Sequence, residues 1–309
     1  MYIGNIIITK QKAMTKKIEK LILEGKSGRD IVADITYPSS INEMANKLPV
    51  VLFCHGFKGF KDWGHFNLMA EEFANKGFVF LKFNFSHNGG TIENPIDFPD
   101  LTAFGENDFI KELEDMNVVL DSFFDLSSVI SGKDAFQSLV PKLDLNNINM
   151  MGHSRGGGVA TIFCANENRI SKLVLLAAVS DFEARQPNEQ VMNHWKEHGA
   201  IYIENGRTKQ KMPMYYTFVE VFENNMELLN IKSSCERLQQ PTHVIQGLND
   251  EVVPPEEAES LIGWLNQPSS MFVENSDHAF GSRHPYEGTG FPGETGIVIN
   301  SAIQFLLKD

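Results

Sequence analysis

Apolar runs alternate with amphipathic segments along most of the chain. The run from Val50 to Cys54 is apolar at every position, as expected for a strand buried on both faces of a sheet. Apolar residues then recur at helical spacing from Phe66 to Phe73, and Gly77 marks the end of the predicted helix. The run from Phe78 to Phe85 predicts the next strand, and residues 87–107 read as a long loop.

The same alternation extends over the rest of the chain. Glu19 to Pro38 predicts two strands joined by a turn at Ser27-Gly28, and Phe109 to Phe123 predicts a helix. Strands that alternate with helices predict a mostly parallel sheet with helices on both faces. The remaining predicted elements are the strands Ile148–Met151, Leu173–Val179, His243–Gln246 and Ser270–Val273 and the C-terminal helix Thr295–Asp309.

One stretch breaks the alternation, because the interval between Val179 and His243 is too long for an unstructured loop in a compact domain. It contains a predicted helix that ends at Gly199, a hairpin turn at Asn205-Gly206, and a predicted helix from 218 to 229. We interpret it as a small cap inserted between two core strands. The predicted division is residues 1–13 as a flexible extension, with Met14 as a possible second start, 14–180 and 236–309 as the core, and 181–235 as the cap.

Charge and composition narrow the class of protein. The chain has 309 residues and a net charge of −13, so nucleic acid and anionic membrane surfaces are poor partners. Three cysteines without motif spacing argue against a disulfide framework, and Cys54 and Cys164 lie in apolar runs typical of a core. The first apolar run precedes its lysines, the reverse of a secretory signal, and no run is long enough to span a bilayer. We expect a cytoplasmic protein.

The most specific motif is the stretch MMGHSRGGGVAT, in which Ser154 lies between Gly152 and Gly156 after a predicted strand. The spacing G-x-S-x-G is that of a nucleophile elbow, a tight turn that exposes the serine hydroxyl. Asp250 and His278 also follow predicted strands, and parallel strands present their carboxyl ends at one edge of the sheet. We therefore predict that Ser154, Asp250 and His278 form a catalytic triad.

These residue types fit one chemistry. A serine hydroxyl is a weak nucleophile at neutral pH and needs a histidine base, which a carboxylate orients. Asp181 is the rival candidate for the carboxylate, because it also follows a core strand. Asp277 is adjacent to His278 in sequence, so its side chain is expected to point elsewhere.

The backbone N–H groups of Arg155 and Phe57 are the predicted oxyanion-hole donors. Arg155 follows the nucleophile at a helix N-terminus, and Phe57 lies in the loop CHGFKGFKDWG after the first buried strand. We interpret His55 in that loop as a residue that braces the turn. Aromatic residues nearby and in the predicted cap could form the substrate pocket, namely Phe60, Trp63, Phe104, Tyr215 and Tyr216.

The motifs HGF, GHSRGG, GLNDEVVPP and SDHAF resemble those of the α/β-hydrolase superfamily, and within it the dienelactone-hydrolase-like serine esterases and the bacterial cinnamoyl and feruloyl esterases. The resemblance covers nearly the whole chain after about residue 18. It implies an α/β-hydrolase fold with a cap between the sixth and seventh strands, and ester hydrolysis without a cofactor. Dienelactone hydrolases use a cysteine nucleophile, so Ser154 argues against dienelactone as the substrate.

We therefore expect a serine esterase that acts on a small or aromatic acyl ester. The alternatives are an aminoacyl, peptide or thioester hydrolase that uses the same triad, and a binding protein of hydrolase fold without catalysis. A prolyl-oligopeptidase-like chain would need room for a propeller domain, which is absent here. The segment HWKEH (His194 to His198) matches an inverted zincin pattern, but we interpret it as a solvated helix face, and we expect no metal.

Overall fold

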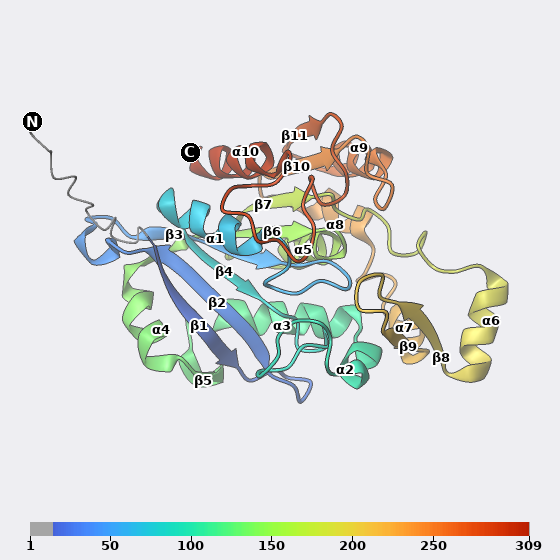
Figure 1. Cartoon of the computed structure of the whole chain (residues 1–309). Helices are drawn as coiled ribbons and strands as arrows, with labels where there is room; N and C mark the ends of the chain where they lie inside the picture. The colour runs from blue at the N-terminus through green and yellow to red at the C-terminus, as the bar shows by residue number, and fades with distance from the viewer. Residues whose placement is uncertain (1–14, 309) are drawn as a thin grey trace, which may run out of the picture.

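The computed structural model describes residues 15–308, so the predicted N-terminal extension and Met14 lie outside the described residues. Its main feature is a nine-stranded sheet in the order β11-β10-β7-β6-β3-β4-β2-β1-β5 (Figure 1). The strands are β1 Thr15–Leu23, β2 Ile31–Pro38, β3 Leu48–Cys54, β4 Val79–Phe83, β5 Val129–Ser131, β6 Leu143–His153, β7 Ile170–Leu176, β10 Thr242–Gly247 and β11 Pro268–Val273.

The sheet is parallel from β4 to β11 and antiparallel at the other edge. β3 pairs in parallel with β4 and β6, and β7 pairs in parallel with β6 and β10. β2 runs antiparallel to both β1 and β4, and the short β5 is antiparallel to β1. The predicted mostly parallel sheet is confirmed.

Helices cover both faces of this sheet. In β3, Val50, Leu52 and Cys54 face one apolar core, and Val51 and Phe53 face the other. The first core is closed by α3, α5, α8 and α9, and the second by α1 and α10 (Figure 1). The helices of the core are α1 Phe66–Asn75, α2 Leu101–Glu106, α3 Phe109–Asp121, α4 Lys133–Leu139, α5 Arg155–Ala165, α8 Ile231–Arg237, α9 Pro255–Trp264 and α10 Thr295–Leu307.

Several boundaries differ from those that the pattern predicts. The predicted loop of residues 87–107 contains α2, which begins where the Asp100 carboxylate accepts a hydrogen bond from the Ala103 N–H at 2.8 Å. β6 begins five residues before the predicted strand. The apolar pattern did not indicate this first half of the strand, because it is polar and only partly buried. The strand predicted to reach Val179 ends at Leu176, and the helix predicted for residues 218–229 ends at Asn224.

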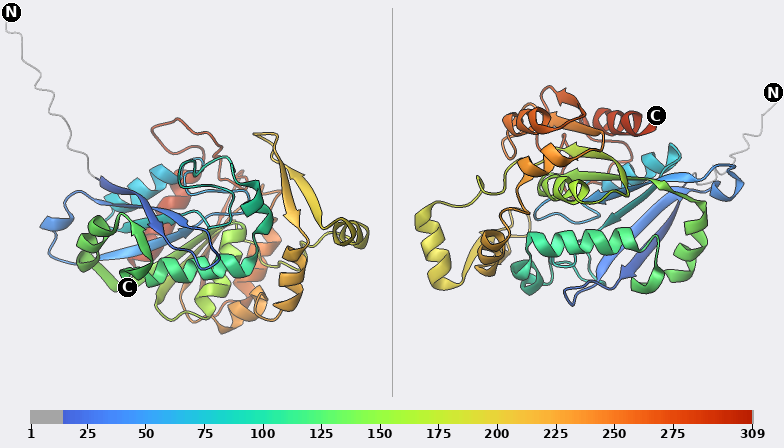
Figure 2. Two further views of the ribbon diagram at one scale, coloured as in Figure 1. Left: turned by 90° about the horizontal axis from the view of Figure 1, so that it is seen from below. Right: turned by 180° about the vertical axis from the view of Figure 1, so that it is seen from behind.

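The insertion between β7 and β10 carries α6 Glu189–His198, the hairpin of β8 Ala200–Glu204 and β9 Lys211–Tyr215, α7 Thr217–Asn224, and α8. If the short β5 is left out, β7 and β10 are the sixth and seventh strands of the sheet. Figures 1 and 2 show α6 and the hairpin projecting to one side of the core. No helix among residues 15–308 combines the length and apolar character needed to cross a membrane.

A buried cluster of charges fixes the loop that follows β3. The Nζ of Lys61 lies 2.6 Å from the Oδ2 of Asp34 in β2, and the Nζ of Lys82 in β4 lies 3.1 Å from the same oxygen. Asp62 completes the cluster at 2.5 Å from both ammonium groups. Burial alone would raise the pKa of Asp34, but Lys82 and Lys61 outweigh it and hold that pKa far below its usual range. The loop is therefore anchored to two strands.

We expect Asp34→Asn to lower the free energy of unfolding by about 3–5 kcal/mol, because it leaves two buried ammonium groups short of a counter-charge. A group with a depressed pKa stabilises the fold above its unfolded pKa and loses that effect as the pH falls. The deficit of the variant should therefore be constant at neutral pH and shrink below about pH 4.

Urea unfolding at several pH values measures this deficit. The control is Glu19→Gln on β1, whose side chain is 71% exposed. Equal losses in the two variants, or a deficit of Asp34→Asn that grows in acid, would contradict the anchoring role of Asp34.

Candidate active site

The turn between β6 and α5 holds Ser154 in a strained conformation. Its φ of +56° and ψ of −127° lie in a region that residues other than glycine rarely adopt. Neighbouring backbone leaves no room for side chains on either flank. A Cβ on Gly152 would lie 2.6 Å from the carbonyl oxygen of Gly156, and a Cβ on Gly156 would lie 2.3 Å from that of His55. The two glycines therefore allow the sharp turn that presents the hydroxyl.

The structure brings the three predicted triad residues together. The Nε2 of His278 lies 3.0 Å from the Oγ of Ser154, and the Nδ1 of His278 lies 2.8 Å from the Oδ2 of Asp250. These residues come from the turn after β6, the loop after β10 and the loop after β11. The side chain of Asp250 is fully buried and that of His278 is 20% exposed. Ser154, at the outer end of the row, lines two cavities.

The turn after β10 holds Asp250 in one orientation. Its Oδ1 accepts hydrogen bonds of 2.8 Å from the N–H groups of Val252 and Val253, and its Oδ2 accepts one from the Gln246 amide at 3.1 Å. Burial alone would raise the pKa of Asp250, but the hydrogen bonds from His278 and Val253 outweigh it, so the pKa is lowered. Asp250 is thus a charged acceptor beside the imidazole.

The two other candidate carboxylates point away from His278. Asp181 is exposed, and its Oδ1 accepts from the N–H groups of Glu183 and Ala184 at 2.7 and 3.1 Å. Asp277 accepts from the N–H groups of Ala279 and Gly281 at 3.0 and 2.9 Å. Both carboxylates cap local turns.

His153 is a contact of this site that the sequence did not single out. Its Nε2 lies 3.0 Å from the carbonyl oxygen of His278, and the two ring centroids are 4.8 Å apart. Burial, reinforced by the neighbouring His278, lowers the pKa of His153 to about 3, so its ring is neutral and donates to that carbonyl. His153 therefore holds the loop that carries His278. The only signal in the sequence is its position next to Ser154.

The loop after β3 lies against the serine. A Cβ on Gly56 would be 2.8 Å from the Cβ of Ser154 and 3.3 Å from its Oγ, so the backbone directly before Phe57 packs against the serine. Burial lowers the pKa of His55 to about 4, and its neutral ring contacts the Gly56 carbonyl at 2.9 Å and the Phe85 N–H at 3.4 Å. Within residues 15–308, the backbone N–H groups of Phe57 and Arg155 donate to no other group of the chain.

The side chain of Arg155 turns away from the serine and joins three elements. Its Nε donates to the Oε2 of Glu112 in α3 at 3.2 Å, and its guanidinium lies 4.2 Å from the ring centroid of Phe109. The rings of Phe57 and Phe218 lie at 5.4 and 5.3 Å. The charge of Arg155 is therefore balanced within the fold, while its backbone N–H remains free.

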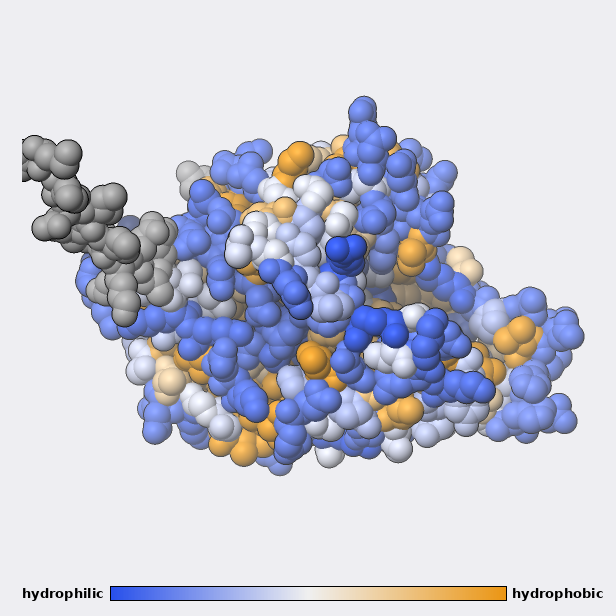
Figure 3. Space-filling view, in the orientation of Figure 1, coloured by the Kyte–Doolittle hydropathy of each residue, from blue (hydrophilic) through white to orange (hydrophobic). Residues whose placement is uncertain are grey.

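Two cavities meet at Ser154. We call the first the insertion cavity, which has a volume of about 620 Å³ and lies between the core and the insertion. Figure 3 shows a hollow in this region, with apolar residues inside it and hydrophilic residues around it. Its apolar wall is formed by Phe109, Val179 and Phe182 from the core and by Trp195, Ile201, Ile203, Met214 and Phe218 from the insertion.

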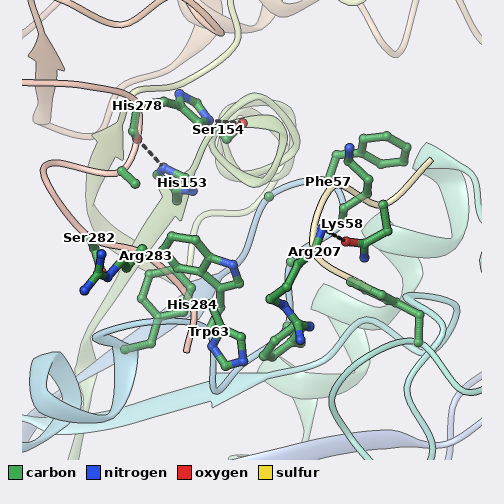
Figure 4. A pocket seen from close by; sticks show the side chains of 17 residues that line it. Phe57, Lys58, Trp63, His153, Ser154, Arg207, His278, Ser282, Arg283 and His284 are labelled. Atoms are coloured by element: carbon green, nitrogen blue, oxygen red, sulfur yellow. Dashed lines mark hydrogen bonds between the residues drawn. The ribbon is translucent and has the colours of Figure 1, made fainter. Parts of the chain in front are cut away.

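The second cavity, which we call the loop cavity, has a volume of about 400 Å³. It lies between the loop after β3 and the segment 279–284 that follows His278 (Figure 4). Phe57, Lys58, Ser154 and His278 line both cavities. The serine therefore has a separate space on each side.

Two of the five predicted pocket residues line a cavity next to the serine. Phe60 and Trp63 line the loop cavity. Phe104 packs against Phe57 and Phe98, with centroid distances of 5.6 and 5.9 Å, and lines neither cavity. The two predicted tyrosines also line neither, because Tyr215 covers Gly105 of α2 and Tyr216 packs edge-on against Trp195. Ile201 and Ile203 also line the insertion cavity, and they were not among the predicted pocket residues. Their alternating positions on β8 are the sequence signal that could have indicated them.

The two histidines of HWKEH lie next to each other on α6, and their ring centroids are 4.1 Å apart. The Nδ1 of His198 lies 3.0 Å from the carbonyl oxygen of His194. Residues 15–308 contain no group of three or more His, Cys, Asp or Glu side chains arranged to hold a metal ion. The three cysteines are buried and free.

The chain belongs to the α/β-hydrolase fold family, whose model matches residues 49–213. A comparison of this chain with curated protein sequences found no match. The structure is similar to that of Est1E from Butyrivibrio proteoclasticus with bound ferulic acid, at a TM-score of 0.65 and 16% identity over 93% of this chain and 98% of that chain.

Two other solved structures share the fold. One, described as a dienelactone hydrolase from Klebsiella pneumoniae, has a TM-score of 0.57 and 12% identity over 96% of this chain and 99% of that chain. The other, puromycin hydrolase, has a TM-score of 0.60 and 16% identity over 94% of this chain and 39% of that chain. At these identities the similarity shows the fold.

We expect Gly156→Ala to lower the free energy of unfolding by about 3 kcal/mol, since the new methyl group must displace the His55 carbonyl. The matched control is Gly263→Ala in α9, where a Cβ meets nothing within 4 Å and should stabilise the helix by about 0.5–1 kcal/mol. Urea unfolding compares the two variants. A Gly156→Ala protein as stable as the wild type would contradict the close packing of the turn.

Proposed function

We propose that this protein is a serine hydrolase that cleaves carboxylic esters through an acyl-enzyme intermediate. The observation that carries the proposal is the continuous row from the Ser154 hydroxyl through His278 to Asp250, with contacts of 3.0 and 2.8 Å. The fold family supports hydrolysis, and the esterase among the similar structures agrees with it. The reaction needs no cofactor or metal.

In the first step the Oγ of Ser154 attacks the ester carbonyl carbon while the Nε2 of His278 accepts the hydroxyl proton. The tetrahedral intermediate collapses, the bond to the alcohol oxygen breaks, and His278 returns the proton to the departing alcohol. A water molecule then attacks the acyl-enzyme with His278 as base, which releases the carboxylic acid and restores Ser154. The Asp250 carboxylate orients the imidazole and stabilises its protonated form.

The N–H groups of Phe57 and Arg155 are the proposed donors to the negatively charged oxygen of the intermediate. Both adjoin the serine in the chain or in space, and neither is used by another acceptor among residues 15–308. Fixed donors of this kind need no reorganisation during the reaction, so they lower the barrier effectively. The ion pairs of the buried Lys61 and the partly buried Asp62 keep the Phe57 loop in place.

The acyl group is proposed to lie in the insertion cavity. Its apolar and aromatic wall suits an aromatic or medium-length acyl chain and keeps water from the reacting carbonyl.

We further propose that the insertion acts as a cap. Its predicted end at 235 falls inside α8, and Ile231 of that helix packs against Gly158 of α5, so we place the end of the cap before α8. The buried free thiols fit the cytoplasmic location that we propose.

Ser154 should be the site of covalent labelling. A fluorophosphonate probe is expected to add once per chain, at Ser154, because its hydroxyl lies at two open cavities and contacts a histidine that the Asp250 carboxylate orients. Peptide mass spectrometry identifies the labelled residue. Labelling or ester hydrolysis that persists in Ser154→Ala would contradict the assignment.

Asp250→Asn should lower turnover by about 10⁴, because an amide no longer selects the productive tautomer of the histidine. Asp181→Asn and Asp277→Asn remove carboxylates that cap local turns and should retain turnover close to that of the wild type. Steady-state kinetics on one ester compares all three. A large loss in Asp181→Asn with a small loss in Asp250→Asn would reverse the roles.

The double variant Ile201→Ala, Ile203→Ala should raise KM for an aromatic acyl ester roughly tenfold, because buried apolar contact with the ring is lost. KM for an acetate ester should change much less. Tyr202→Ala is the matched control, since its side chain is 66% exposed on the same strand. Equal changes for both esters in the double variant would show that the insertion does not select the acyl group.

A further inference from the structure

The loop cavity has a positively charged lining. Its 17 lining residues include Lys58, Arg207 and Arg283, and none of them is an aspartate or a glutamate. The whole chain has 40 acidic and 27 basic residues, so its general field repels anions. Three cationic side chains around a cavity that opens at Ser154 are therefore a local reversal of the charge of the molecule.

Two of these cations are not balanced by the fold. Lys58 and Arg283 make no ion pair with any residue in the described part of the chain. The insertion cavity is also lined by Lys58, Arg155 and Arg185, but there Arg155 pairs with Glu112 and Arg185 pairs with Glu257. The loop cavity thus has positive charge for which the protein supplies no counter-ion.

Arg207 reaches the same cavity from the insertion. The hairpin turn fixes its backbone, because the Oδ1 of Asn205 accepts from the Arg207 N–H at 3.0 Å. Its guanidinium pairs with Asp97, and about one third of each side chain is exposed. Figure 4 shows Arg207 extending toward Trp63 and His284 on the opposite wall. An exposed pair of this kind is weak, and the guanidinium has further N–H groups for a second anion.

The opposite wall adds an aromatic surface and a neutral donor. His284 stacks on Trp63 at 6.3 Å between centroids, and its Nδ1 accepts from the Gly64 N–H at 3.0 Å. Burial lowers the pKa of His284, so the ring is neutral and its proton lies on Nε2. The wall can therefore donate a hydrogen bond without adding charge.

We infer that the loop cavity binds the alcohol part of the ester and that this part carries an anionic group. The inference rests on the proposed function. His278 returns its proton to the departing alcohol oxygen, and the segment that directly follows His278 lines the loop cavity. The acyl group then occupies the apolar insertion cavity. Arginine and lysine contacts to an anion are charge-assisted and stronger than neutral hydrogen bonds.

Three benzoate-type esters test the inference. Methyl benzoate is neutral, carboxymethyl benzoate carries a carboxylate on the alcohol side, and monomethyl terephthalate carries one on the acyl side. We expect wild-type kcat/KM to be highest for carboxymethyl benzoate and lowest for monomethyl terephthalate. The preference should weaken as the ionic strength rises, because salt screens exposed charges. A preference for monomethyl terephthalate, or none between the other two, would overturn the inference.

The variant for this test is Lys58→Gln, Arg283→Gln. Its preference for carboxymethyl benzoate over methyl benzoate should fall roughly tenfold or more relative to the wild type. The control is Lys133→Gln, Lys142→Gln, with Lys133 in α4 and Lys142 just before β6, at the opposite end of that strand from Ser154; it removes the same charge away from the cavity. An equal fall in the two double variants would show a general field effect and overturn the inference.

A measurement on the unaltered protein guards against misfolding of the variant. Glycolate should inhibit methyl benzoate hydrolysis more strongly than ethylene glycol does, and equal inhibition would overturn the inference. The two proposals fail differently. If methyl benzoate hydrolysis is absent or survives Ser154→Ala, the proposed function is wrong. If Ser154 cleaves methyl benzoate but the charge preference is missing, only the anionic subsite is wrong.

Discussion

The site depends on the contact between the turn after β6 and the loop after β3. Gly156 lies so close to the His55 carbonyl that a Cβ would approach it to 2.3 Å, and a Cβ on Gly56 would lie 2.8 Å from that of Ser154. This packing stabilises the positive φ of Ser154, and Phe57 lines the same two cavities as the serine. A backbone strain that costs free energy is tolerated where the surrounding structure fixes it, and here two sequence-distant loops do so.

The rest of the structure supports this contact from three sides. The buried ions of Asp34, Lys61 and Lys82 fix the loop after β3, and the turn around Asp250 fixes the histidine through its carboxylate. His153 holds the backbone of His278 from the opposite side. The catalytic side chains that we propose are thus placed by buried polar contacts, while the two cavities are left to select the substrate.

The sequence predicted the parts of this arrangement that have a strong local signature. Apolar runs such as Val50 to Cys54 predicted the buried strands, and the glycines around Ser154 predicted the turn. It did not predict α2, since a six-residue helix that begins at Leu101 has too few turns for a periodic pattern. Residue type alone also did not place Tyr215 and Tyr216 correctly, because they pack against Gly105 and Trp195 and not toward the cavities. The direction of a side chain in a small insertion depends on such tertiary contacts.

We propose that catalysis passes through an acyl group on Ser154. Rapid quenching of the protein with an aromatic acyl ester, followed by mass spectrometry of the intact chain and its peptides, tests this claim most directly. An acyl-enzyme mechanism predicts an added mass equal to the acyl group in place of one hydrogen, located on Ser154 and formed before steady-state turnover. Turnover without any such adduct, together with an active Ser154→Ala variant, would contradict it.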